Sequence, residues 1–451
     1  MNRVAGVVRQ VATSQVSKLL TLRAALLLLG FVASLVYTRL VVDHLGLEVY
    51  GIVALVVAIP LMIPFADFGL GASIVNAAAR ARAHGDADVV TTTVRRVRGI
   101  YVWIAGGLSA LAVSVAATGW WSRLLGTEGS GLPIDWAVCV VLMAFALTLT
   151  VSPGTRVIQG LGRVGEATTF NTAATLTGTI IVAGALPWGV PFWLAVVAPS
   201  ASSFLVNTIA LARARSLLRR LGTSPQTGAD EPPVETVESV STLLRWGVAG
   251  MVIAAGVAAM TQGSRVILSH VGSPEDLAEF SLVWMVYAGA NALVAVYGAY
   301  LWPRWRTTEV HTVLSRGALF REYRRAALLG LLLGLGFWVV TPPALDIFVG
   351  HAPTSLAVAA ASACLFLQAI HQPAAMLLMT RSGMRWQALV ILAITPISLI
   401  VSYVSIPRTG AAAPFLALAL VVGFLQIPLT LGYSLKHLND QSAQRGKEVS
   451  P

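Results

Sequence analysis

Charge and cysteine are both scarce in this chain of 451 residues. Charged residues make up 11% of it and hydrophobic residues 56%. A soluble domain carries about 25% charged residues, so the composition excludes that class and indicates a polytopic membrane protein. The two cysteines, Cys139 and Cys364, both lie in apolar stretches. They therefore indicate packing, and they predict neither a disulfide framework nor a metal site.

Motifs of common enzyme classes are also missing. The lysines are Lys18, Lys436 and Lys447, and no G-x4-G-K-[ST] loop is present, which argues against nucleotide hydrolysis. No H-E-x-x-H motif for zinc occurs either. A membrane glycosyltransferase would need acidic residues on a sizeable outer loop, and the longest one, from Ser122 to Pro133, offers only Glu128. We therefore expect no enzyme activity, no cofactor and no metal.

Long apolar stretches dominate what is present. A membrane-spanning helix needs about 20 apolar residues, and twelve stretches qualify. They lie near residues 19–42, 50–79, 99–119, 134–157, 168–187, 191–212, 246–270, 279–302, 326–342, 354–379, 388–405 and 412–435. Arginines gather in alternate connections, which the positive-inside rule assigns to the cytoplasm. We therefore predict an all-α membrane protein with twelve transmembrane helices and cytoplasmic N and C termini, and we attribute the net charge of +11 to this topology rather than to nucleic-acid binding.

A short pattern, Arg-x4-His-x-Gly, occurs at the end of the first and the seventh predicted span. Its members are Arg39, His44 and Gly46 in one copy and Arg265, His270 and Gly272 in the other. A polar stretch rich in Pro, Thr, Ser and Glu separates the halves, as a flexible linker would. The repeat predicts two six-helix lobes related by a pseudo-twofold axis along the membrane normal.

These features give the following predicted boundaries. Residues 1–18 form an amphipathic cytoplasmic segment, 19–212 the N-lobe, 213–245 the cytoplasmic linker, 246–435 the C-lobe and 436–451 a cytoplasmic tail.

The charges within the apolar spans are mainly Arg39 and Arg265, and a charge near the centre of a span costs about 2.5 to 3.5 kcal/mol. Arg39 and Arg265 occupy matched positions near the outer ends of spans one and seven. One interpretation is that both side chains reach outward to lipid headgroups. The other is an anion contact at the outer mouth of a central cavity.

The second span carries a break and a carboxylate. Pro60 and Pro64 interrupt the helical hydrogen bonds, so we expect a bent or interrupted helix near Asp67 and the two glycines that follow, Gly69 and Gly71. Asp67 either caps the restarted helix or is a site for proton or cation coupling.

Further polar side chains recur at helical spacing within the spans. Gln368, His371 and Gln372 share one face of span ten and favour a cavity wall, and His371 is a second candidate for ion coupling. Gln262 in span seven and Asn291 in span eight are candidate substrate contacts. The threonines of span five, including Thr172 and Thr179, indicate contacts between helices or, as the alternative, a helix face toward water.

The run RLVVDHLGLEVYGIVALV, followed by FADFGLGASIVNAAARA, resembles the start of bacterial polysaccharide-export and O-antigen flippases. Their superfamily also holds multidrug and toxin extrusion antiporters and lipid II flippases. The residues that carry the resemblance are Arg39, Leu45, Gly46, Tyr50, Gly51, Asp67, Gly69 and Gly71. The resemblance implies a two-lobed bundle in the bacterial cytoplasmic membrane, which moves a polyprenyl-pyrophosphate-linked oligosaccharide to the outer leaflet by alternating access.

Residue chemistry fits that anionic cargo. Guanidinium groups bind pyrophosphate through paired hydrogen bonds, and Arg39 and Arg265 outnumber the one firm acid within the spans, Asp67. The alternative is a proton- or sodium-coupled small-molecule or multidrug antiporter of the same fold. The expected partners are the lipid-linked oligosaccharide and membrane lipids, with a proton or sodium ion and polysaccharide-assembly enzymes as further candidates and no nucleic acid.

Overall fold

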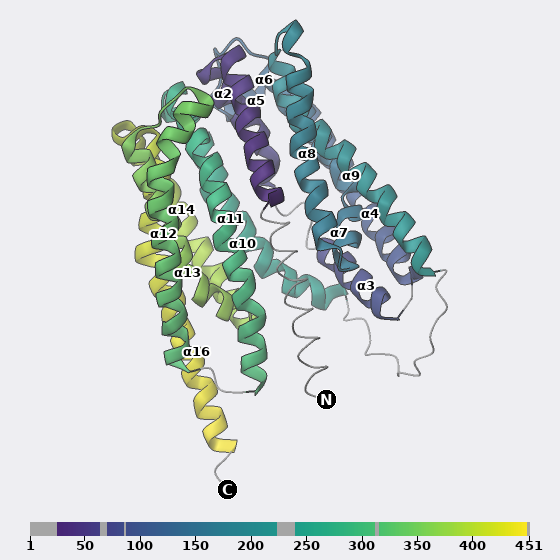
Figure 1. The fold of residues 1–451 in the computed structure, drawn as a ribbon, viewed down its shortest axis with the longest axis vertical. Helices are drawn as coiled ribbons and strands as arrows, with labels where there is room; N and C mark the ends of the chain where they lie inside the picture. The colour runs from purple at the N-terminus through teal and green to yellow at the C-terminus, as the bar shows by residue number, and fades with distance from the viewer. Residues whose placement is uncertain (1–24, 64–69, 85–86, 223–239, 312–314, 449–451) are drawn as a thin grey trace. The chain divides into compact units, whose positions relative to one another are not determined.

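The computed structural model describes residues 25–63, 70–84, 87–222, 240–311 and 315–448, and the regular structure in these ranges is helical (Figure 1). Ten segments of the described chain are long and apolar enough to cross a membrane. The second predicted span contributes a shorter apolar helix, Leu47–Met62, and the last two predicted spans lie within one segment, Ser382–Asp440. The helical membrane class is therefore confirmed, while the twelve spans and the side of the termini stay predictions.

The chain forms two compact units. Unit 1 comprises Met1–Gly46, Ala66–Trp121 and Gly131–Val237. Its first described helix is Ala25–Leu45. The others are α3 (Leu70–His84), α4 (Ala87–Ala117), α6 (Ile134–Val151), α7 (Pro153–Gly160), α8 (Val164–Gly184), the 3-10 helix η3 (Leu186–Trp188) and α9 (Phe192–Gly222), and the short α5 (Trp120–Leu124) begins in this unit.

Two threonine hydroxyls join α8 to the first helix within unit 1. Thr172 Oγ1 donates to Leu26 O at 3.2 Å, and Thr179 Oγ1 donates to Ala33 O at 3.0 Å. A hydroxyl in an apolar span needs such a partner because lipid offers none. The prediction that these threonines mediate contacts between helices is therefore confirmed.

Unit 2 comprises Leu47–Phe65, Ser122–Ser130 and Glu238–Pro451. Its helices are α2 (Leu47–Ala58), the 3-10 helix η1 (Ile59–Met62), α10 (Val240–Val271), α11 (Pro274–His311), α12 (Arg316–Val349), α13 (Ser355–Leu377), α14 (Arg381–Thr409), the 3-10 helix η4 (Gly410–Ala412), α15 (Ala413–Val421), the π-helix η5 (Val422–Gln426) and α16 (Ile427–Glu448).

Two segments of unit 2 precede the linker in sequence, so the compact units differ there from the predicted lobes. The packing of α2 explains one of them. Gly51 lets α2 approach α11 so closely that a Cβ at this position would lie 3.0 Å from Ala278 N. A side chain is thus excluded where the two helices meet, and α2 belongs to the core of unit 2.

The predicted linker is partly helical. Helix α9 continues to Gly222 and α10 begins at Val240, which leaves 223–239 outside the described residues. Leu211, Ala214 and Leu217 are buried at helical spacing along the end of α9. This apolar stripe continues the helix beyond the predicted boundary at residue 212.

The N-terminal part of α11 holds two other connections of unit 2. Asp276 accepts hydrogen bonds from Ser273 N at 3.0 Å and from Ala411 N at 3.1 Å. The buried carboxylate of Glu279 accepts from Thr354 N at 3.0 Å and from the Thr354 hydroxyl at 2.6 Å. The N-terminal part of α11 therefore anchors the turn before α13 and the turn after α14.

Replacing Asp276 with alanine should destabilise unit 2. The change removes both a helix cap and the bond to Ala411, so we expect a loss of about 2 kcal/mol. A lower midpoint of thermal unfolding in detergent measures it. Asp440→Ala, at an exposed position on α16, is the matched control, and equal midpoints for the two variants would contradict the anchoring role.

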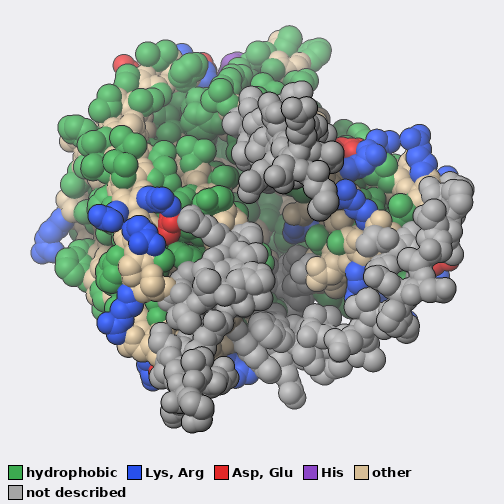
Figure 2. All heavy atoms as spheres, turned by 60° about the horizontal axis from the view of Figure 1, so that its bottom comes forward, with side chains coloured by type: hydrophobic (Ala, Val, Ile, Leu, Met, Phe, Trp, Pro, Cys, Tyr) green, Lys and Arg blue, Asp and Glu red, His purple; other side chains and the backbone are tan. Residues whose placement is uncertain are grey.

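The described surface is largely apolar, as expected for a protein in lipid. Trp103 and Phe424 expose 85% and 76% of their surface. In Figure 2, which turns the bottom of Figure 1 forward, hydrophobic side chains cover much of the surface, and Lys and Arg side chains gather on the forward face with few Asp or Glu. This distribution agrees with the arginine-rich connections of the sequence.

Candidate functional site

Both copies of the Arg-x4-His-x-Gly pattern end a helix in the same way. His44 Nδ1 lies 2.9 Å from Leu40 O, and His270 Nδ1 lies 2.8 Å from Val266 O. The glycine N–H of each copy donates to the carbonyl four residues earlier, Gly46 to Val42 and Gly272 to Leu268. The repeat is therefore a repeat of local structure, with histidine and glycine satisfying the last carbonyls of a helix.

The arginine of the first copy is neutralised within its own helix. Arg39 Nε lies 2.6 Å from Asp43 Oδ2, and the two side chains are each 42% exposed. An ion pair of this exposure stabilises a helix weakly. Asp43 stands four residues after Arg39 in the sequence, so the pair follows from helical spacing, although the sequence analysis missed it.

Arg265, the arginine of the second copy, lies in a different environment. It is 7% exposed, and its NH1 group donates to Ala54 O of α2 at 2.9 Å. The guanidinium carbon lies 5.9 Å from the centre of the Phe280 ring of α11, within range of a cation–π contact. Carbonyl and ring are both uncharged, so no acid in these contacts neutralises this buried cation.

Two polar atoms on the same face of α10 have no partner among the described residues. One is Arg265 Nε, and the other is Oε1 of Gln262, which lies three residues earlier and is 6% exposed. A buried donor and acceptor without partners are costly, and such groups ask for a ligand or water. Gln262 and Arg265 therefore form the core of the candidate site.

A second polar group lies on α13. His371 is 7% exposed, and its Nε2 atom has no hydrogen-bond partner among the described residues. Gln372 is half-buried, and its Oε1 atom packs against Gly298 of α11, where a Cβ would collide with it. Gln368 is also half-buried. No hydrogen bond in the described part of the chain joins these three side chains to Gln262 or Arg265.

The other predicted site residues are placed only in part. Asn291 is half-buried in α11. The helix break at Pro60 is confirmed, because α2 ends at Ala58 and a 3-10 helix follows. Asp67, like Pro64 and Gly69, lies outside the described residues, so its role in ion coupling stays a prediction.

One buried acid that the sequence analysis missed is Glu322 of α12, which is 3% exposed. Its Oε1 atom accepts from Arg325 NH1 at 2.6 Å, and its Oε2 atom accepts from Tyr297 Oη at 3.2 Å. Arg325 three residues later was the available signal. Across the described residues, no group of three or more His, Cys, Asp or Glu side chains could hold a metal ion.

The chain is similar to proteins of known families. A family model described as "Polysaccharide biosynthesis protein" matches residues 15–305. No curated protein matches the chain.

Solved structures resemble the whole chain. An inward-facing multidrug resistance MATE family transporter of the MOP superfamily is 13% identical, with 96% of this chain and 99% of that chain covered and a TM-score of 0.64. The lipid II flippase MurJ in an inward closed conformation is 11% identical, with 92% and 87% covered and a TM-score of 0.61. A MOP superfamily transporter from Pyrococcus furiosus is 14% identical, with 94% and 96% covered and a TM-score of 0.57. At these identities the likeness shows the fold.

Proposed function

Because the chain belongs to the polysaccharide biosynthesis protein family, we propose that it is a flippase for a lipid-linked oligosaccharide of the cell envelope. The cargo is a polyprenyl-pyrophosphate-linked oligosaccharide, moved from the inner to the outer leaflet of the bacterial cytoplasmic membrane by alternating access without ATP hydrolysis. A lipid II flippase shares the fold, which supports a cargo of this chemistry. The oligosaccharide crosses the membrane while its lipid tail stays in the bilayer.

The observation that carries the proposal is the buried guanidinium of Arg265, for which the described part of the chain provides no acidic partner. Its NH1 group and ring contact fix the guanidinium plane, and its free Nε–H can donate to a pyrophosphate oxygen in the charge-assisted geometry that arginine favours. The Gln262 carbonyl, one turn away, can accept from a sugar hydroxyl or amide. Asn291, Gln368, His371 and Gln372 are the proposed further contacts to sugar hydroxyls.

Arg39 takes a secondary place in this proposal. Its ion pair with Asp43 already neutralises it, so it contacts the outer headgroup region and contributes little to cargo binding.

The alternative is a proton- or sodium-coupled antiporter for small molecules, because MATE transporters share the fold. A cationic cargo would need a buried acid that is free to bind it. Unit 2 buries Glu279 and Glu322 in its described part, and both already accept hydrogen bonds. The charges therefore favour the anionic cargo.

The test is translocation in proteoliposomes that contain the purified protein and a polyprenyl-pyrophosphate oligosaccharide. Outward movement of two negative charges gains roughly 4.6 kcal/mol at 100 mV, at about 2.3 kcal/mol per charge. We therefore expect transport to follow an imposed inside-negative potential and to continue when no proton or sodium gradient is present. Transport that stops when the potential is collapsed, despite a proton gradient, fits this expectation.

Two other outcomes change the proposal. Transport that needs a proton or sodium gradient assigns the coupling to an ion, with Asp67 and His371 as its proposed sites. Efflux of a cationic dye without movement of the oligosaccharide contradicts the flippase and supports the antiporter.

A further inference from the structure

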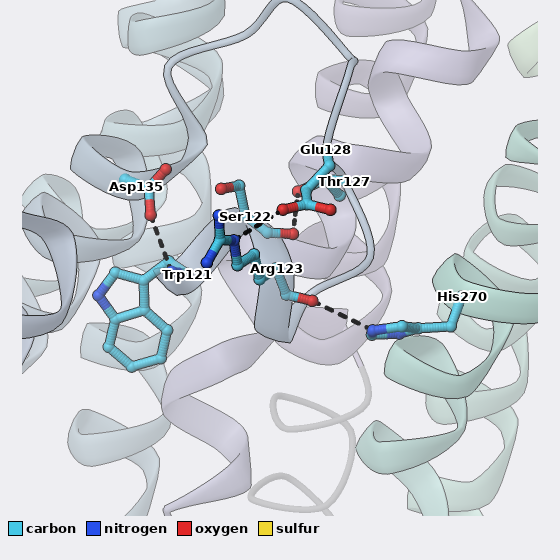
Figure 3. Close-up of polar contacts among 7 residues, drawn as sticks. All are labelled: Trp121, Ser122, Arg123, Thr127, Glu128, Asp135 and His270. Carbon is cyan, nitrogen blue, oxygen red and sulfur yellow. Dashed lines mark hydrogen bonds and ion pairs between the residues drawn. The ribbon is translucent and has the colours of Figure 1, made fainter. Parts of the chain in front are cut away.

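His270 lies at the C-terminal end of α10, and its ring contacts the backbone carbonyl of Arg123 (Figure 3). Its Nδ1 atom lies 2.8 Å from Val266 O, and its Nε2 atom lies 3.2 Å from Arg123 O, both within unit 2. A carbonyl oxygen only accepts hydrogen bonds. Neutral imidazole has one N–H and one lone pair, whereas imidazolium has two N–H groups. Only the protonated ring therefore donates to both carbonyls.

The segment Ser122–Ser130 packs directly against this ring. Gly126 has φ of +61°, and a Cβ there would lie 2.8 Å from His270 Cγ and from Ser269 O. Leu125 is 4% exposed and anchors the segment. The Thr127 N–H donates to Ser122 O at 2.9 Å, so the segment is an ordered turn with protected amides.

The charged groups near His270 have other partners or are exposed to solvent, and the contacts of the ring are with the two carbonyls. Arg123 Nε pairs with Glu128 Oε1 at 3.0 Å, as Figure 3 shows. On α11, Glu275 is exposed and Asp276 is bonded to backbone groups. Arg265, on the same helix as His270, donates to Ala54 O.

His44 provides an internal comparison because it ends the first helix with the same Nδ1 bond. Within the described ranges its ring contacts one carbonyl, Leu40 O, and a single acceptor is satisfied by neutral and protonated imidazole alike. The second carbonyl therefore distinguishes the second copy of the motif from the first.

We propose that His270 is a protonation-dependent clasp that holds the segment Ser122–Ser130 on α10. The imidazolium donates to Val266 O and Arg123 O. Loss of one ring proton leaves a lone pair facing a carbonyl oxygen, and the segment is released. Docking is therefore complete while both ring nitrogens carry a proton, and it is lost when a rising pH removes one of these protons. The clasp depends on the geometry of unit 2 and not on the proposed cargo.

Hydrogen–deuterium exchange of the purified full-length protein tests this clasp. Exchange rates of peptides that cover 122–130 are compared at about pH 6 and about pH 8, after correction for the intrinsic pH dependence of exchange. We expect protection to fall roughly 10-fold at the higher pH, the change expected for losing one hydrogen bond of about 1.4 kcal/mol.

Four variants make the result specific. In His270→Gln the segment should be weakly protected at both pH values, while His44→Gln should respond as the intact protein does. Glu128→Gln removes the neighbouring carboxylate and should keep the response.

Gly126→Ala displaces the segment with His270 intact, and it should abolish the response even if His270→Gln fails to fold. Protection in the intact protein that does not change with pH, or a response that persists in His270→Gln or Gly126→Ala, would overturn the clasp.

Discussion

Translocation of the oligosaccharide headgroup should fall roughly 10- to 100-fold when Arg265 is replaced by glutamine, a loss of about 1.4 to 2.8 kcal/mol. The reason is that Arg265 is a buried cation without an acidic partner among its contacts. Glutamine keeps some hydrogen bonding but removes the charge that would attract pyrophosphate. The measurement is the initial rate of headgroup translocation in proteoliposomes at a fixed membrane potential.

Arg39→Gln is the matched control, because the repeat places Arg39 at the same position of its motif. Its guanidinium is half-exposed and paired with Asp43, so we expect less than about a twofold change. Arg265→Lys should recover only part of the rate, since lysine keeps the charge but lacks the planar fork of arginine.

Arg265 also bonds to α2, so a lost rate alone does not separate binding from packing. Binding to the detergent-purified protein separates them. The intact protein should prefer the pyrophosphate-linked oligosaccharide over the same oligosaccharide on a neutral lipid, and Arg265→Gln should lose that preference. A preference that survives, or equal losses in the Arg39 and Arg265 variants, would remove Arg265 from the cargo site.

Much of the fold could be predicted from the sequence because apolar length determines where helices cross a membrane. The predicted breaks also follow from local chemistry, as the end of α2 before Pro60 shows. The grouping of α2 with the second half of the chain could not be predicted this way. It depends on the close approach of Gly51 to Ala278, a contact between residues far apart in sequence.

The candidate site shows the same division between local and distant information. The motif placed Arg39 and Arg265 at equivalent positions of two helix ends. The hydrogen bonds of the histidine and the glycine repeat in both copies. The environments of the two arginines differ, and only that of Arg39 could be predicted from nearby residues in the sequence. Asp43 was visible in the sequence at helical spacing from Arg39, whereas the Ala54 carbonyl and the Phe280 ring beside Arg265 come from other helices.

The packing of α7 gives the second large prediction. Gly154 lies so close to α9 that an added Cβ would overlap the backbone N and Cα atoms of Leu211. A side chain in the way could rotate, but the backbone of a helix cannot. Gly154→Ala should therefore push α7 away from α9 and cost unit 1 about 3 kcal/mol or more, the upper part of the usual range for overpacking. We expect a large loss of monodisperse protein on size exclusion and a lower midpoint of thermal unfolding.

Two other glycines test whether this loss comes from backbone overlap. Gly107 in α4 has no atom within 4 Å of an added Cβ, so Gly107→Ala should leave the midpoint unchanged or raise it, by about 0.5 to 1 kcal/mol for a helical glycine. At Gly298 the added Cβ would meet the ends of the Gln372 and Met376 side chains, which can rotate, so Gly298→Ala should fold well. If Gly154→Ala folds as well as these two variants, the inference that the backbones of α7 and α9 are in close contact is contradicted. If Gly154→Ala is the only one of the three variants that is destabilised, position 154 requires glycine because the backbones of α7 and α9 meet there.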